Sequence, residues 1–288
     1  MNEKAKEKCP VCGSQDYKYK KRNKGLDLGY CESCSLAYAR PLIRGGANDV
    51  GDSNSTITEA DFYEGLKKNH TLQSQIAMIK APKMLEYWQK ILAENTGRKL
   101  SILEIGCGTG QYYEAWKNLK VDWTGLEVNK DMLNFCKSKN IPVVDTNIMD
   151  TKLDKQYDII FLSQVLEHII DPNFFIKKIH SNMAEGGILH IDVPNHDSLS
   201  SLYRKLNPFH PEYGFLQPNH HLIAYNKNAL NYLLTNNKFN IVHLDAHSND
   251  DKVLGQLVTT NSILNKLVFW LSNIIGKGSL LVAVARRS

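Results

Sequence analysis

Four cysteines near the start of the chain have the spacing of a metal site. Cys9 and Cys12 form one C-x2-C pair, Cys31 and Cys34 form a second, and eighteen residues separate the two pairs. Each pair can turn two thiolates toward one cation, and two pairs complete a tetrahedral set of sulfur ligands. The pattern predicts a structural zinc site in a small ribbon whose folding depends on the metal. Disulfides or free thiols are the alternative, and disulfides are disfavoured because the N-terminal residues contain no apolar stretch typical of an export signal.

A glycine-rich turn is the second feature that could do chemistry. Ile102 to Ile105 is a short apolar run, Gly106 to Gly110 reads G-C-G-T-G, and Gln111 to Leu119 has a helical pattern. A strand, a glycine turn and a helix form the entrance of a dinucleotide-type fold, where glycines let a ligand approach the backbone closely. The spacing is G-x-G-x-G, which differs from the G-x-G-x-x-G of a nicotinamide site.

An acidic residue supports the turn as a nucleoside site. The run from Val121 to Glu127 reads as a second strand, and Glu127 lies 21 residues after Gly106. An acid at the end of the second strand can accept hydrogen bonds from both hydroxyls of a ribose.

These residues resemble the class I S-adenosylmethionine-dependent methyltransferases. Leu103 to Gly110 matches the first motif of that family, and Glu104, two residues before the first glycine, is a mark that nicotinamide enzymes lack. The resemblance covers about residues 98–245, and the segments that resemble the third, fourth and fifth strands are 143–148, 157–168 and 186–195. The ribbon followed by this domain resembles a bacterial subgroup that methylates glycans and secondary metabolites.

The resemblance implies an α/β fold. We expect a Rossmann-like, mostly parallel sheet with an antiparallel last strand, flanked by helices, plus the N-terminal zinc ribbon. The expected organisation is a ribbon with a basic N-terminus over 1–40, a linker or mobile loop over 41–58, a helical cap over the cofactor cleft over 59–97, and the methyltransferase domain over 98–288. A histidine-, proline- and aromatic-rich insertion on the acceptor side occupies about 196–226.

The resemblance also implies which residues bind S-adenosylmethionine. Asn147 stands where the family usually has an acid for the adenine amino group, and an amide could still pair with adenine. Tyr63 is a candidate contact from the cap, with packing in a core as the alternative. The expected set is Glu104, Gly106, Cys107, Gly108, Gly110, Glu127, Val128, Asn147, Ile148, Ser163, Gln164 and Tyr63.

Histidines in the acceptor-side insertion are the candidates for a general base. An acceptor hydroxyl or amine must lose a proton, and the pKa of histidine lies near neutrality. His221 is the first candidate, His220 the second and His196 the third. The alternative for each is a histidine that caps a turn or binds a backbone carbonyl. His168 is expected to be a packing residue.

Composition and charge limit the class of protein. Of the 288 residues, 42% are hydrophobic and 23% charged, which excludes a disordered or fibrous chain. Residues 1–24 hold eight Lys or Arg and three acids, and the rest of the chain is balanced at 27 of each sign. We therefore weigh binding of RNA by the basic segment against the simpler interpretation of a solvated surface.

The leading hypothesis is a cytoplasmic S-adenosylmethionine-dependent methyltransferase, directed at an oxygen atom of a small-molecule or sugar-linked acceptor. An RNA methyltransferase and a non-catalytic cofactor-binding module are the alternatives. The Asn/Asp-Pro-Pro-Tyr/Phe motif of base-amino methylation is absent, and Val193-Pro194-Asn195 stands in its place. An apolar helical stripe over 263–275 predicts core or a homodimer surface, with a membrane-facing role as the minor alternative, and no stretch is long enough to span a bilayer.

Overall fold

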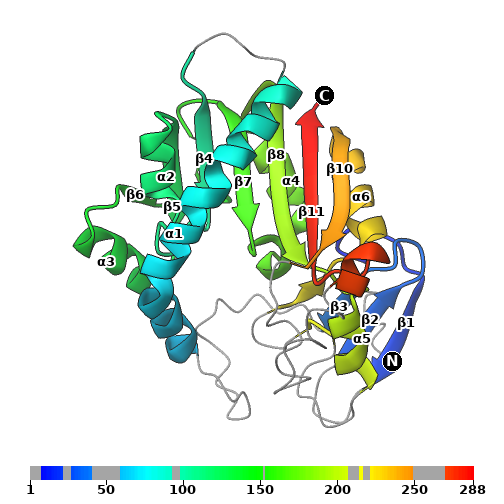
Figure 1. Cartoon of the computed structure of the whole chain (residues 1–288). Helices are drawn as coiled ribbons and strands as arrows, with labels where there is room; N and C mark the ends of the chain where they lie inside the picture. The colour runs from blue at the N-terminus through cyan, green and yellow to red at the C-terminus, as the bar shows by residue number, and fades with distance from the viewer. Residues whose placement is uncertain are drawn as a thin grey trace. The chain divides into compact units, whose positions relative to one another are not determined.

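The computed structural model describes residues 8–21, 27–40, 59–92, 98–151, 153–206, 214–216, 221–248 and 270–288 (Figure 1). The chain divides into two compact units. The ribbon unit comprises Met1–Ser53, Gln164–Asn173 and Ile191–Val284, and the glycine-turn unit comprises Asn54–Ser163, Phe174–His190 and Ala285–Ser288. The predicted linker over 41–58 and His220 lie outside the described residues.

Four parallel strands form the centre of the glycine-turn unit. They are β4 (Ser101–Ile105), β5 (Asp122–Glu127), β6 (Val143–Asp145) and β7 (Tyr157–Ser163). β4 pairs in parallel with β5 and with β7, and β5 pairs in parallel with β6. Residues 102–105, which are apolar except for Glu104, are buried throughout, as expected for a parallel strand that is covered on both faces. The carboxyl ends of these strands therefore lie along one edge.

Three further strands extend this sheet. The complete order is β10-β11-β8-β7-β4-β5-β6, in which β8 is Met183–Pro194, β10 is Phe239–His247 and β11 is Leu280–Arg287. The last strand, β11, inserts between β8 and β10, and its arrow in Figure 1 points opposite to that of β8. The expected Rossmann-like sheet, mostly parallel and flanked by helices, is confirmed.

Helices of the glycine-turn unit follow its strands. They are α2 (Tyr113–Asn118), α3 (Lys130–Ser138) and the larger part of α4 (Pro172–Ser181). The segment expected to form a helical cap folds as one long helix, α1 (Glu59–Leu92), which packs against α2 and α3. Trp88 anchors α1: its buried ring lies 5.7 Å from that of Trp116, and its Nε1 donates to Nδ1 of His190 at 3.1 Å.

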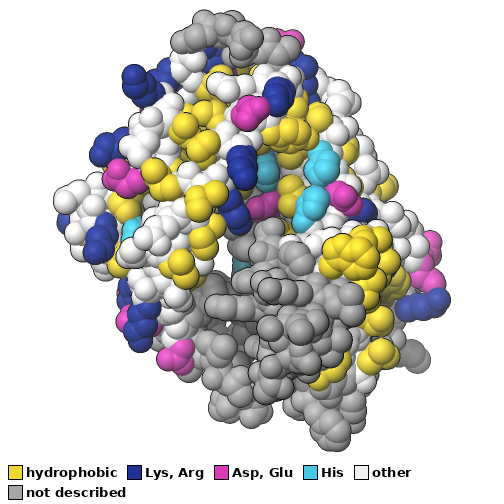
Figure 2. All heavy atoms as spheres, in the orientation of Figure 1, with side chains coloured by type: hydrophobic (Ala, Val, Ile, Leu, Met, Phe, Trp, Pro, Cys, Tyr) yellow, Lys and Arg dark blue, Asp and Glu magenta, His cyan; other side chains and the backbone are white. Residues whose placement is uncertain are grey.

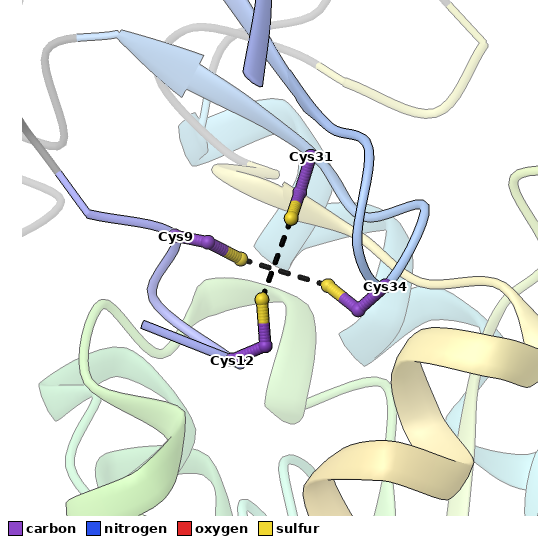
Figure 3. Close-up of side chains that lie close together, drawn as sticks. All are labelled: Cys9, Cys12, Cys31 and Cys34. Atoms are coloured by element: carbon purple, nitrogen blue, oxygen red, sulfur yellow. Dashed lines mark hydrogen bonds between the residues drawn. The ribbon is translucent and has the colours of Figure 1, made fainter. Parts of the chain in front are cut away.

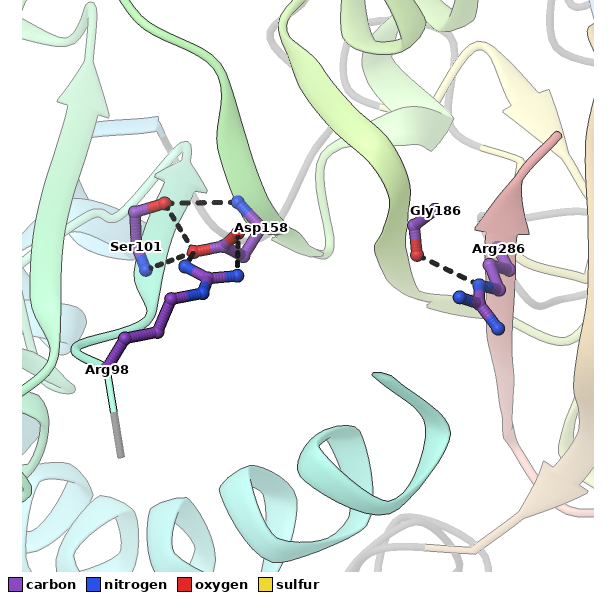
Figure 4. A network of polar contacts seen from close by, with 5 residues as sticks. All are labelled: Arg98, Ser101, Asp158, Gly186 and Arg286. Atoms are coloured by element: carbon purple, nitrogen blue, oxygen red, sulfur yellow. Dashed lines mark hydrogen bonds and ion pairs between the residues drawn. The ribbon is translucent and has the colours of Figure 1, made fainter. Parts of the chain in front are cut away.

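A polar network ties β7 to the residues that lead into β4 (Figure 4). Both terminal nitrogens of Arg98 donate to the carboxylate of Asp158 at 2.8 Å, and the amide and hydroxyl of Ser101 donate to one of its oxygens at 2.8 Å. Burial acts to raise the pKa of Asp158, but the hydrogen bonds from Arg98 and Ser101 outweigh it and lower the pKa below its usual value. The carboxylate is thus held ionised at the start of both strands.

The ribbon unit has its own antiparallel sheet. Its strand order is β1-β2-β3-β9, with bounds Tyr17–Lys21, Asp27–Cys31, Ala37–Arg40 and Ile223–Ala224. A small apolar core of Leu28, Ala37, Ala39, Leu216 and Ala224 packs inside it. The unit also contains the 3-10 helix η1 (Leu166–His168), α5 (Leu199–Leu206) and α6 (Lys227–Asn236). Segments from the N-terminus and from the predicted acceptor-side insertion therefore share one sheet.

The C-terminal stripe was expected to be core or a homodimer surface, and its described part is not core. Of its seven apolar positions, the structure describes Leu271, Ile274 and Ile275, and these three are exposed together with Trp270. Figure 2 shows hydrophobic side chains gathered in this part of the surface. Among the described helices, none is long and apolar enough to cross a bilayer. Association through this stripe remains a prediction.

Candidate functional site

The glycine-rich turn joins β4 to α2 and is fastened to the end of β5. Gly106, Gly108 and Gly110 have φ angles of 68°, 56° and 68°, which lie in the left-handed region that glycine adopts without steric cost. The amides of Gly106 and Cys107 donate to the carbonyl of Leu126 at 2.8 and 3.0 Å. The turn is therefore a fixed element of the sheet edge.

Gly108 and Gly110 have different surroundings. A Cβ atom at Gly110 would lie 2.7 Å from Cγ2 of Ile141, so this glycine is needed for packing. A Cβ at Gly108 would meet nothing within 4 Å. The open side of Gly108 is where a ligand can reach the backbone.

Glu127 contacts this turn directly. Its Oε2 accepts from the amide of Gly108 at 2.8 Å, and its Oε1 accepts from the amides of Val128 and Asn129 at 2.8 and 2.9 Å. A carboxylate has about four lone-pair sites, so acceptor capacity remains for a further donor such as a sugar hydroxyl. The structure thus brings Glu127 and the glycine turn together, as the sequence predicted.

Two buried groups lie behind the turn. Burial raises the pKa of Glu104 to about 8, although Nε1 of Trp123 donates to its carboxylate at 2.8 Å. Cys107 is buried, and burial raises the pKa of its thiol, so it is not an activated nucleophile. Both side chains support the turn from inside.

The other predicted cofactor residues of this unit follow the carboxyl ends of the same parallel strands. Val128 is exposed after β5, Asn147 is exposed and Ile148 is buried after β6, and Ser163 ends β7 half-buried. Asn147 Oδ1 accepts from the amide of Met149 at 2.9 Å, which shapes a local turn. This edge is where ligands bind in parallel α/β sheets.

Gln164 comes directly after Ser163, whereas Tyr63 belongs to the long helix α1. Gln164 is an exposed residue of the ribbon unit with a φ of 57°. Its backbone N–H donates to the carbonyl of Asp192 at 2.9 Å. Tyr63 is half-buried in α1 of the glycine-turn unit. Their predicted contacts with the cofactor remain predictions.

The four predicted metal ligands converge in the ribbon unit, as Figure 3 shows. The Sγ atoms of Cys9 and Cys34 are 3.6 Å apart, those of Cys12 and Cys31 are 3.4 Å apart, and all four lie within 4.8 Å of one another. None of these cysteines is disulfide-bonded. Ligands on a tetrahedral ion with Zn–S bonds of about 2.3 Å stand about 3.8 Å apart, so the separation and the donor type fit such an ion.

Both cysteine pairs form the same turn. The amide of Gly13 donates to the carbonyl of Cys9, and the amide of Ser35 donates to that of Cys31, each at 2.9 Å. Gly13 and Ser35 both have positive φ angles, 70° and 61°. The equivalent turns direct two thiols each toward one point.

Asparagine side chains bind these turns to the rest of the unit. Nδ2 of Asn173 donates to the carbonyls of Pro10 and Val11 at 2.8 Å. Nδ2 of Asn226 donates to the carbonyl of Ser35 at 2.9 Å, while its Oδ1 caps α6. The cysteine cluster is therefore built into the ribbon unit.

The described candidate bases differ in their surroundings. Nδ1 of His221 lies 3.1 Å from the carbonyl oxygen of Phe215, and its half-buried ring lies 4.9 Å from that of His168. His196 is buried, and burial together with the charge of Lys205 lowers its pKa to about 3. A histidine with so low a pKa is a weak base, so His221 has the better-suited surroundings.

Glu167 is a residue that the sequence analysis did not assign. Its side chain is 1% exposed, and neither carboxylate oxygen accepts a hydrogen bond from another described residue. Burial raises its pKa to about 8, and the charge of Asp192 adds to the effect. The carboxylate and the imidazoles of His168 and His221 offer ligand atoms within 4.8 Å of one another. The Glu-His pair of the fourth-strand motif was the only signal in the sequence.

The structure describes only part of the basic N-terminal segment, residues 1–24. Residues 1–7 and 22–24 lie outside the described residues. Lys18, which is described, is exposed and forms an ion pair with Glu32 at 2.5 Å. The hypothesis of an RNA-binding tail gains no support from this geometry.

The fold and the sheet-edge turn are those of class I methyltransferases. The Methyltransferase domain family matches residues 77–244, which is more than half of the chain. The chain belongs to this family.

Known proteins show the same relationship. The chain is 29% identical over 185 residues to a probable (S)-tetrahydroprotoberberine N-methyltransferase 2 of Papaver bracteatum, covering 61% of this chain and 45% of that protein. It is 26% identical over 130 residues to a ubiquinone biosynthesis O-methyltransferase of Bordetella avium, covering 42% and 53%. The chain thus spans about half the length of these curated relatives.

Solved structures share the fold. A SAM-dependent methyltransferase from Archaeoglobus fulgidus superposes with a TM-score of 0.51 at 21% identity, covering 74% of this chain and 94% of that one. The plantazolicin methyltransferase BpumL, solved in complex with SAH, gives a TM-score of 0.51 at 18% identity, covering 80% and 88%.

Proposed function

We propose that this protein transfers a methyl group from S-adenosylmethionine to a small-molecule acceptor. One observation carries the proposal: the backbone at Gly108 is open on its ligand side, and its amide is bound to the carboxylate of Glu127. A turn that is open at Gly108, next to a fixed acid, suits a nucleoside that carries a charged tail. Membership in the Methyltransferase domain family supports the same conclusion.

Each residue of the sheet edge has a role in holding the cofactor. Glu127 would accept from the ribose hydroxyls, and the backbone from Gly106 to Gly110 would accommodate the amino-acid tail. Glu104 supports that turn, and Val128, Asn147 and Ile148 would hold the adenine. Ser163, Gln164 and Tyr63 complete the expected set. S-adenosylmethionine supplies an activated methyl group, so the protein mainly aligns the acceptor for in-line transfer.

We assign the acceptor atom to an oxygen and the acceptor to a small or sugar-linked metabolite. The names of the relatives support small molecules as acceptors, with both N- and O-methyltransferases among them. The absence of the base-amino motif at Val193-Pro194-Asn195 supports oxygen rather than a nucleobase amine.

A histidine removes the proton of an acceptor hydroxyl in this proposal. His221 is the candidate that the geometry favours, because its half-buried ring is held by the Phe215 carbonyl. When Nδ1 of His221 carries the proton and donates it to this carbonyl, the lone pair is on Nε2. Nε2 can then accept the proton of the acceptor hydroxyl. His220 remains second, and His196 third because of its pKa of about 3.

The cysteine cluster is proposed to hold a structural zinc ion. Cys9, Cys12, Cys31 and Cys34 supply four sulfurs and leave no coordination position for a substrate. The ion would stabilise the two turns and the short sheet of the ribbon, whose core is too small to fold alone.

Calorimetry of the zinc-loaded chain with S-adenosylmethionine and with S-adenosylhomocysteine tests the cofactor site. Both compounds are expected to bind, and Gly108→Arg is expected to abolish binding by filling the open side of the turn. Absence of heat with both compounds would refute the proposal.

Turnover requires a panel of hydroxyl-bearing acceptors read by mass spectrometry for the gain of one methyl group. His221→Ala is expected to bind S-adenosylhomocysteine like the wild type and to lose at least tenfold in turnover. Full activity of this variant would remove His221 as the base.

A further inference from the structure

One carboxylate and two imidazoles converge in the ribbon unit. Glu167 and His168 are neighbours in η1, and His221 lies two residues before β9. Their ligand atoms all lie within 4.8 Å of one another, and the two imidazole rings are 4.9 Å apart at 69°. Segments more than 50 positions apart in the sequence thus bring three ligand-type side chains to one place.

The state of Glu167 points to a ligand. Both of its carboxylate oxygens are buried and accept no hydrogen bond from the described residues. Leaving a buried carboxyl group without a partner costs several kcal/mol, and buried charges in native proteins are paired or bound to metal ions. The charged neighbour that affects Glu167 is another acid, Asp192, so these surroundings favour a cation.

His221 is oriented as a metal-binding histidine would be. Its Nδ1 lies 3.1 Å from the carbonyl oxygen of Phe215, so this nitrogen carries the proton and donates it. The lone pair is then on Nε2. A histidine ligand almost always donates its other ring N–H to a carbonyl or carboxylate in this way.

We propose that Glu167, His168 and His221 bind a divalent transition-metal ion, in a site separate from the four cysteines. A carboxylate and two imidazoles suit Zn²⁺ and its first-row neighbours, whereas the four thiolates form a closed structural set. Three protein ligands leave at least one position on the ion for water or a hydroxyl group.

The bound ion changes the role of His221. Its Nε2 would then be a ligand and could not accept a proton, and the ion's charge would lower the pKa of a hydroxyl bound at the open position, whose proton would pass to solvent water. This consequence rests on the proposed methyl transfer, but binding of the ion does not.

Zinc content per chain tests the site. The full-length wild type, Glu167→Gln and His221→Ala are equilibrated with the same buffered Zn²⁺ solution, desalted and measured by mass spectrometry for metal. We expect two zinc ions per chain in the wild type and one in each variant. The difference of one ion does not depend on whether S-adenosylmethionine binds.

A matched control uses the histidines of β10. His243 and His247 of β10 have Nε2 atoms 3.4 Å apart. His243→Ala is expected to keep both ions. Loss of one ion in His243→Ala, with both kept in Glu167→Gln, would overturn the proposal and place the ion at β10. A single ion in the wild type would overturn it as well.

A measurement on the wild type guards against variants that fail to fold. Protein that holds one equivalent of Zn²⁺ is titrated with Co²⁺. The proposal predicts weak visible bands without sulfur-to-cobalt charge transfer, as for nitrogen and oxygen ligands. The proposal would be contradicted if no Co²⁺ bound, or if the only absorption that appeared were sulfur-to-cobalt charge transfer.

Discussion

Gly108→Ala and Gly110→Ala separate the binding role of the glycine turn from its packing role. Both residues have positive φ angles, 56° and 68°, so an alanine at either position costs about 1–2 kcal/mol of folding free energy. Only Gly110 adds a steric clash, because its Cβ would lie 2.7 Å from Cγ2 of Ile141. Overpacking of this kind costs a further ~1–3 kcal/mol.

The expected results therefore diverge. Gly108→Ala should lower the free energy of unfolding by about 1–2 kcal/mol and Gly110→Ala by about 2–5 kcal/mol. The Cβ at position 108 would project into the open space where the ligand is proposed to bind, so S-adenosylhomocysteine should bind Gly108→Ala at least tenfold more weakly, equivalent to about 1.4 kcal/mol. Folded Gly110→Ala should retain most of the affinity.

Urea denaturation and calorimetry with S-adenosylhomocysteine provide the two measurements, both at a temperature where each variant is folded. Equal destabilisation of the two variants would refute the steric reasoning at Gly110. Wild-type affinity in Gly108→Ala would refute the assignment of the open side of the turn to the ligand.

Cys12→Ser should lose the zinc ion of the cysteine cluster and unfold the ribbon, seen as one ion fewer per chain and a lower melting temperature; retention of that ion would contradict a four-sulfur site. The pKa of Glu104 is raised to about 8 in the folded protein, so folding stability should fall as the pH rises from about 4.5 to about 8, and a Glu104→Gln variant should show a flatter dependence in denaturation at several pH values. Asp158 has a lowered pKa, so its contribution is present above about pH 4 and is lost as the pH falls through the folded pKa. Asp158→Asn should therefore cost about 2–3 kcal/mol at neutral pH, and the difference from the wild type should vanish in acid; a difference independent of pH would contradict the ionised network.

The parts of the fold that could be predicted from the sequence have local signals. The apolar run from Ile102 to Ile105 followed by glycines predicts a buried strand and a turn, and β4 spans Ser101–Ile105. The run from Val121 to Glu127 likewise corresponds to β5, Asp122–Glu127. The apolar residues of β4 and the glycine-rich turn after it are neighbours in the sequence, so no distant information is needed to find them.

The pairing of β3 with β9 has no such signal. Ala37 pairs with Ala224 and Tyr38 with Ile223, across most of the chain, and β9 is only two residues long. A strand of this length has no alternation to detect, and its register is set by the partner. For this reason the ribbon and the acceptor-side insertion were predicted as separate parts of the chain.

Glu167 and His168 were missed for a related reason. A Glu-His pair after a strand carries no distinctive spacing, and His168 was expected to be a packing residue at the exit of the fourth strand. Its ring does make an edge contact, but with His221, which the chain brings in from 53 positions later. The chemistry of the pair depends on that third residue and on the burial of Glu167, and both are products of tertiary structure.

The sheet of the ribbon links the two predicted ion sites of its unit. The amide of Ala39 donates to the carbonyl of Leu222 at 2.8 Å, one residue after His221. Tyr225 follows the same strand, and its buried hydroxyl has a raised pKa because of burial and the charges of Glu167, Cys9 and Cys34. The cysteine cluster therefore helps to fix the position of His221 through β3 and β9, and a zinc ion bound there would act on the histidine through the backbone.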